Sequence, residues 1–238
     1  GLVGSEMCIR DSPCAKPELL KSFHTGDYIA VLKKTEVSQK ISEKDAKTYN
    51  IGSLSNPVFP EMFKRPATSV GSSLLAADLV ANGGRAYSLG GGLHHGMTGY
   101  ANGFCFLNDL AFAINRLRDL GVQRIAYIDL DAHHCDGVAA AFPEDENLFV
   151  VSTHERKRWP FTGGLDENIP DRFLNVPLPS HCNDAEFMFV FEKLVLPLLD
   201  RFQPEALIIQ GGADALVEDP MSRPVSYTHL TLPTRCLV

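Results

Sequence analysis

The sequence predicts an α/β domain in which a parallel β-sheet is flanked by helices on both faces. Two observations predict it. Short, nearly continuous apolar runs indicate strands that are buried on both sides, and amphipathic segments of helical length alternate with them. Such alternation is typical of βαβ units. With 238 residues, 45% of them hydrophobic and 21% charged, the chain is long and apolar enough for one buried core.

The first half of the chain carries two expected helices and one expected strand. Residues 68–81 repeat apolar side chains at helical spacing and precede the apolar run 86–89, which we expect to be a strand. Residues 107–120 again show helical spacing, and Gly121 is a typical stop signal after them.

The second half carries three expected strands and one expected helix. Runs 124–130, 148–152 and 206–210 are rich in β-branched or aromatic residues. Residues 184–202 form the expected helix, which begins at a capping-box pattern on Asn183. The polar clusters of the chain follow these strands, and the carboxyl ends of parallel strands are where such sheets bind ligands.

Composition excludes several classes of protein. The net charge of −7 argues against direct binding of nucleic acid or of an anionic membrane surface. No run approaches 18 consecutive apolar residues, so we expect no membrane span. The six cysteines form no CxxC pair, and no signal peptide is visible. We therefore expect a cytoplasmic protein with reduced thiols.

Both ends of the chain differ from its body. Residues 1–12 and 224–238 show neither clear periodicity nor a capping pattern, and they resemble translated sequencing-adapter read-through. We expect both segments to be non-native and the natural domain, residues 13–223, to be incomplete at its C-terminus.

The strongest chemical signal is an acidic and histidine-rich cluster. Asp129, Asp131 and His133 alternate along the end of an expected strand, so their side chains project the same way. Asp214 follows the expected strand 206–210 and adds a further donor. Two carboxylates, one imidazole and an open position are typical of a catalytic zinc site. The alternative is an ordinary acidic strand end with satisfied hydrogen bonds.

Two adjacent histidines follow three glycines after the expected strand 86–89. His94 and His95 could be metal ligands, a pH-sensitive surface feature or acid/base groups. Because three other residues already suffice for the metal, acid/base catalysis is the simplest reading. Asp129 and Asp136 are the spare carboxylates that could orient one histidine each.

Aromatic residues near the two histidines could line a narrow apolar channel. Phe104 follows Gly103, and Trp159 is a candidate for the opposite wall. The alternatives are packing in the core, which we favour for Phe106, and packing of Trp159 on the surface.

Five sequence blocks, in order, resemble the zinc-dependent histone deacetylase superfamily, which includes bacterial acetoin-utilisation-type and acetylpolyamine-amidohydrolase-like members. They are GGGLHH, GFCFLND, YIDLDAHHCDGV, VVSTHE and GGADALVEDPMS. The resemblance covers about residues 19–223 and implies an arginase/deacetylase α/β fold.

The resemblance also implies roles for individual residues. Zinc would be held by Asp131, His133 and Asp214. The general acid/base pair would be His94 and His95, supported by Asp129 and Asp136. A structural potassium ion would take Asp129, Asp131, His133 and Ser152. The acyl-lysine tunnel would be lined by Gly103, Phe104 and Trp159.

The sequence departs from the family pattern at two places. The aspartate that grips the substrate backbone at the tunnel rim aligns near Ser55. The glycine-rich loop whose tyrosine stabilises the oxyanion has no counterpart, because Tyr227 does not lie in a glycine run. Loss of that donor would impair this chain.

The expected function is hydrolysis of the N-acetyl amide of acetyl-lysine, in an acetylated protein or a small acetylated amine. The alternatives are an arginase-like ureohydrolase with two Mn²⁺ ions and a non-catalytic acyl-lysine binder.

Overall fold

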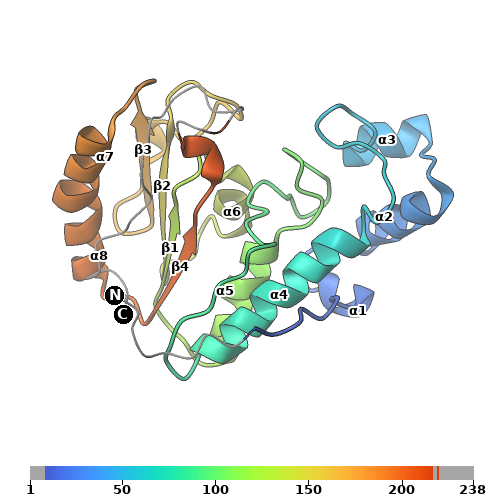
Figure 1. Ribbon diagram of the computed structural model, residues 1–238, viewed down its shortest axis with the longest axis horizontal. Coiled ribbons are helices and arrows are strands. Elements are labelled where there is room, and N and C mark those ends of the chain that lie inside the picture. Colours follow the sequence, from blue (N-terminus) through green and yellow to red (C-terminus); the bar gives the residue numbers. More distant parts are fainter. Residues whose placement is uncertain (1–8, 217–218, 220–238) are drawn as a thin grey trace.

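The computed structural model describes residues 9–216 and residue 219, and its centre is a parallel sheet. The strands β1 (Ile125–Asp129), β2 (Leu148–Glu155), β3 (Phe173–Leu178) and β4 (Ala206–Gln210) lie in the order β3-β2-β1-β4. All three pairings are parallel. The α/β architecture predicted from the alternating pattern is therefore confirmed (Figure 1).

Helices cover both faces of this sheet (Figure 1). The α-helices are α1 (Pro17–Leu20), α2 (Gly26–Ser38), α3 (Glu43–Tyr49), α4 (Lys64–Val80), α5 (Asp109–Asp119), α6 (Asp136–Ala141), α7 (Asp184–Val190) and α8 (Leu196–Phe202). Short turns of other helix types are η1 (Leu165–Glu167), η2 (Phe191–Val195) and η3 (Ala213–Ala215).

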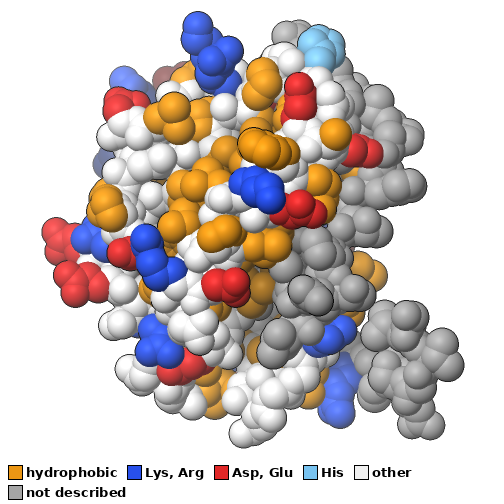
Figure 2. Space-filling model, turned by 90° about the vertical axis from the view of Figure 1, so that its left-hand side faces the viewer, with side chains coloured by type: hydrophobic (Ala, Val, Ile, Leu, Met, Phe, Trp, Pro, Cys, Tyr) orange, Lys and Arg blue, Asp and Glu red, His pale blue; other side chains and the backbone are white. Residues whose placement is uncertain are grey.

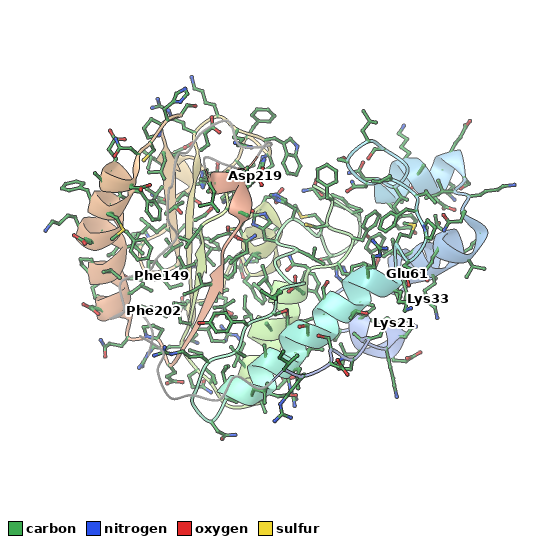
Figure 3. All side chains as sticks on the ribbon, in the orientation of Figure 1. Lys21, Lys33, Glu61, Phe149, Phe202 and Asp219 are labelled. Carbon is green, nitrogen blue, oxygen red and sulfur yellow. The ribbon has the colours of Figure 1, made fainter. Side chains whose placement is uncertain are left out.

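One face of the sheet packs against α7, η2 and α8. Buried side chains of these helices, among them Phe187, Phe191 and Val195, contact the sheet in one apolar cluster. Phe149 of β2 and Phe202 of α8 lie with their ring centroids 5.4 Å apart at the end of this layer (Figure 3). The outer side of the same helices mixes charged and apolar side chains (Figure 2). The buried face of these helices is apolar, as expected for helices that lie on a sheet, and their outer side also exposes Phe189 and Leu194.

The opposite face of the sheet packs against α5 and α6. Ile114 and Leu117 of α5 belong to one buried cluster with Ile125 and Tyr127 of β1. A further cluster holds α1, α2 and α4 together around Tyr28 and includes Phe106, which is buried as expected. All five residues of β1 are buried, which agrees with the apolar run 125–128 that precedes Asp129.

The expected strand 86–89 does not form, and this prediction is wrong. Within the described residues the sheet ends at β4, and no isolated bridge involves these residues. Tyr87 is 74% exposed and Leu89 is fully exposed at 100%. An apolar run becomes a strand only where a partner backbone takes its hydrogen bonds, and none of the described segments does so here.

The strand β3 was not expected from the sequence. Its residues FLNVPL include Asn175 and Pro177, which weaken the apolar pattern. Pro177 is tolerated because β3 pairs only with β2 in the described sheet, so its missing N–H breaks no ladder on the free side.

The three expected helices are confirmed with shifted bounds. α4 begins at Lys64 and not at residue 68, because the Glu36 carboxylate of α2 accepts the backbone N–H groups of Phe63 and Lys64. This cap comes from another helix, so no local pattern predicts it. The expected helix 184–202 is divided by the π-helical turn η2.

Residues 1–8 of the expected N-terminal non-native segment, and all of 224–238, lie outside the described residues. Among the helices that the structure describes, none combines the length and the hydropathy needed to cross a bilayer.

Candidate active site and metal centre

The polar residues meet at the carboxyl edge of the sheet. Asp129 ends β1, and it lies in register with Gln210, which ends β4. Asp131 and His133 follow β1, and Asp214 lies in the turn η3 after β4. Parallel strands therefore bring together residues that are far apart in sequence.

Asp131, His133 and Asp214 form one compact donor group. Nδ1 of His133 lies 3.0 Å from Oδ1 of Asp131 and 2.8 Å from Oδ2 of Asp214. One ligand atom from each residue lies within 4.8 Å of the others. The structure thus brings together all three predicted metal ligands.

Neighbouring groups hold the two carboxylates in place. Asp131 accepts hydrogen bonds from the backbone N–H of His133 at 2.8 Å and from Nε2 of Gln210 at 3.2 Å. Asp214 accepts the backbone N–H of Ala132 at 3.1 Å. A Cβ atom on Gly212 would lie only 2.1 Å from Oδ2 of Asp131, so a glycine is needed for this close approach.

This donor set fits one divalent cation. Two carboxylates and one imidazole leave open coordination positions, as in catalytic zinc sites. Within the part of the chain that the structure describes, this is the one group of three or more His, Cys, Asp or Glu side chains that could hold a metal. That finding gives no support to a centre with two metals.

His94 and His95 each face one carboxylate, as predicted. Nδ1 of His94 lies 2.7 Å from Oδ2 of Asp129, and Nδ1 of His95 lies 2.6 Å from Oδ1 of Asp136. A carboxylate can only accept, so each Nδ1 carries a proton. The two imidazole rings are adjacent, with centroids 3.9 Å apart, and both are buried. Nε2 of His94 lies 3.8 Å from Oδ2 of Asp131.

The environment shifts the pKa values of the two histidines in opposite directions. Burial lowers the pKa of His94, but the charges of Asp129 and Asp131 outweigh burial and raise it to about 10. For His95, burial and the neighbouring His94 lower the pKa below 6.5, although Asp136 opposes this. A charged and a neutral imidazole side by side suit an acid and a base.

Asp109 holds the loop that carries both histidines, and the sequence analysis missed it. Its buried carboxylate accepts the backbone N–H groups of Gly92 at 3.1 Å and Leu93 at 2.7 Å, and it also accepts the hydroxyl of Ser73. Burial raises the pKa of Asp109. The sequence does place an acidic residue in the first turn of an expected helix. Acidic residues are common there because they stabilise the helix N-terminus, so this position alone did not indicate a contact with the histidine loop.

His24 supports the same region and was likewise missed. Its Nδ1 lies 3.1 Å from the carbonyl oxygen of Met97, and its Nε2 accepts the backbone N–H of Asn108 at 3.1 Å. The side chain of Asn108 then donates to the carbonyl oxygen of Gly96, next to His95. No motif in the sequence indicates this chain of contacts.

The predicted aromatic residues lie beside His95. The ring of Trp159, which is 37% exposed, meets the His95 ring edge-to-face at 4.7 Å. Phe104 is 66% exposed, and its backbone N–H donates to Oδ1 of Asn56. Ser55 precedes Asn56 in that loop and is half-buried.

Residues of the expected potassium site are also close together. Asp129 and Ser152 are paired across β1 and β2, and both are fully buried. The Ser152 hydroxyl lies 3.0 Å from Nδ1 of His154. Potassium binding itself stays a prediction, and Tyr227 lies outside the described residues.

Comparison with known proteins identifies the family that the chain matches. A model of the histone deacetylase domain matches residues 1–232. The acetoin utilization protein AcuC of Bacillus subtilis (strain 168) is 36% identical over 225 residues, 91% of this chain and 56% of that protein. AcuC of Staphylococcus aureus (strain MSSA476) is 34% identical over 229 residues, 93% of this chain and 58% of that protein.

Solved structures are similar as well. The crystal structure of an HDAC homologue from Aquifex aeolicus is 40% identical with a TM-score of 0.85, and the match covers 90% of this chain and 59% of that one. An HDAC homologue complexed with SAHA has the same identity and TM-score and covers 91% and 59%. The chain therefore spans less than two thirds of the length of these relatives.

Proposed function

Because the chain belongs to the histone deacetylase family, we propose that it acts as a zinc-dependent amidohydrolase on acetyl-lysine or a similar acylated amine. One observation carries the proposal. The three donors of Asp131, His133 and Asp214 converge beside two histidine–carboxylate pairs of opposite pKa shift. This arrangement suits metal-assisted hydrolysis of an amide, which uses a metal-activated water, a general base and a general acid.

Zinc at this site would polarise the acetyl carbonyl and make water a better nucleophile. His95 holds its proton on Nδ1 toward Asp136, so its Nε2 lone pair is available to accept a proton from the attacking water. His94 has a raised pKa and keeps a proton on both nitrogens, and it can donate the one on Nε2 to the departing amine.

The substrate side of the site is aromatic. Phe104 and Trp159 would line the aliphatic stem of the acetylated side chain and exclude water from it. We propose an acetylated protein or a small acetylated amine as substrate. The net charge of −7 disfavours direct nucleic-acid or membrane partners, and we propose a cytoplasmic location.

A structural potassium ion beside the zinc is part of the proposal. Its ligands would come from Asp129, Asp131, His133 and Ser152. The support is the buried pairing of Asp129 with Ser152 across neighbouring strands.

Metal content tests the proposal directly. The purified chain should bind one zinc ion, and Asp131→Ala and His133→Ala should lose it. The zinc-loaded chain should release acetate from an acetyl-lysine peptide or an acetylpolyamine. Full zinc occupancy in both variants would contradict the metal assignment.

Other outcomes point to the alternative functions. Two Mn²⁺ ions per chain with release of urea from arginine would favour a ureohydrolase. Tight binding of an acetyl-lysine peptide with no hydrolysis in the presence of zinc would favour a binding protein.

A further inference from the structure

A partly buried arginine lies against the candidate metal ligand His133. Nε of Arg158 is 3.0 Å from Nε2 of His133, on the side of the ring that faces away from Asp131 and Asp214. The side chain of Arg158 is only 14% exposed, so its charge is partly removed from water.

The position of Arg158 is fixed by its surroundings. Nη1 of Arg158 donates to Oε2 of Glu155 at 2.8 Å, and the Glu155 side chain is 11% exposed. The other oxygen of Glu155 accepts the hydroxyl of Ser180 at 2.6 Å. The backbone N–H of Glu155 donates to the carbonyl oxygen of Ala132, next to His133. The guanidinium is thus held beside the ligand by a partly buried ion pair with Glu155, the last residue of β2.

This contact has the opposite polarity to the usual support of a metal-binding histidine. A ligating imidazole normally donates its second N–H to a carboxylate, a carbonyl or water. Arginine has only N–H groups and cannot accept a hydrogen bond. The hydrogen bond from Arg158 therefore occupies the lone pair on Nε2 of His133, and the ring proton must lie on Nδ1, between Asp131 and Asp214.

Nδ1 is the nitrogen that converges with the two carboxylates, so it is the one that would bind a metal. A cation at this position needs the Nδ1 lone pair, and the contact with Arg158 favours the other tautomer. The guanidinium also places a positive charge near the bound cation, where partial burial leaves the repulsion poorly screened.

We propose that Arg158 is a positioning residue that lowers the affinity of the metal site for its divalent cation. The inference rests on the proposed metal site and adds a determinant of how tightly it holds zinc. Two effects lower the affinity. Metal binding at Nδ1 breaks the hydrogen bond from Arg158 to Nε2 of His133, and the guanidinium repels the bound cation.

The test compares zinc affinities of the full chain by competition with a chromogenic chelator. Arg158→Met should bind zinc about tenfold more tightly than the original chain, a change of the size expected when support of a ligating histidine is altered. Arg156→Met and Lys157→Met are matched controls, because each removes one positive charge from the same loop at an exposed position. Both controls should keep the original affinity.

Arg158→Gln provides a second, independent variant should Arg158→Met fail to fold. Its amide oxygen can accept the Nε2 proton of His133, so it should also bind zinc more tightly. Zinc affinity that is unchanged or weaker in folded Arg158 variants would overturn the inference while leaving the metal site intact. A folded chain that binds no zinc in any form would overturn the proposed metal centre, and the inference with it.

Discussion

Asn102 donates a hydrogen bond from Nδ2 to Oδ2 of Asp136 at 2.9 Å, while the other oxygen of the same carboxylate faces His95. The amide thereby fixes the plane of the carboxylate that orients the candidate base. Asn102 touches no reacting atom, and its effect must pass through Asp136.

We predict that Asn102→Ala lowers kcat for an acetyl-lysine substrate about tenfold and leaves KM nearly unchanged. The reason is that orientation of His95 matters for proton transfer more than for ground-state binding. Steady-state kinetics on the zinc-loaded protein measures both constants. A rise in KM with unchanged kcat would assign Asn102 to substrate binding instead.

We predict that His95→Ala keeps its zinc and loses most of its turnover. His95 faces Asp136 and lies outside the donor group of three, so its loss should affect proton transfer and not metal retention. Elemental analysis together with kcat separates the two roles. Loss of zinc by a folded His95→Ala protein would show that the histidine is a ligand.

The pH dependence of that reaction should follow from the neutral state of His95. Burial and the neighbouring His94 lower its pKa, so the base form persists to lower pH than for an ordinary histidine and is lost as the pH falls through the lowered value. We therefore expect the acidic decline of kcat/KM to lie at lower pH than the titration of an ordinary histidine, with a level profile above it. A steep decline that begins above pH 7 would contradict the assignment.

The local part of the candidate site could be predicted from the sequence, whereas the contacts that support it could not. Asp131 and His133 lie two residues apart at the end of one strand, so their spacing alone indicates a pair of metal ligands. The supports are not local, because Asp109, His24 and Glu36 act on residues 16 to 84 positions away. Segment 86–89 was mispredicted for a similar reason. Its apolar composition indicated a strand, but a strand also needs hydrogen bonds from a neighbouring backbone, which the local sequence does not specify.

We predict that Gly103→Ala strongly reduces turnover, by about 10²-fold, because Gly103 has a positive φ of 50° and no free space. A Cβ atom there would lie 2.4 Å from Cη2 of Trp159 and 2.7 Å from Cδ2 of His95. Both rings must therefore move. Gly99→Ala is the matched control, since its Cβ would meet only Thr25 at an ordinary 3.8 Å. Equal kinetics for the two variants would show that the ring positions tolerate the shift.

The buried imidazole of His24 should make the stability of the protein depend on pH. Burial lowers the pKa of His24 from 6.5 to about 4, although hydrogen bonds to the carbonyl oxygens of Thr98 and Met97 oppose the shift. Its Nε2 accepts a backbone N–H from Asn108, and a protonated ring could not do so. The folded state therefore requires the neutral imidazole.

Because the folded pKa is lower than the unfolded one, the unfolded chain binds a proton first as the pH falls. The free energy of unfolding should be unaffected by His24 above pH 7 and should decline between pH 6.5 and pH 4, with a loss of about 2 kcal/mol at pH 5. Urea denaturation at pH 7, 6 and 5 measures this. His24→Gln cannot titrate, so its unfolding free energy should fall less steeply over the same range than that of the original chain. Parallel pH profiles for the two proteins would show that His24 is not the group responsible.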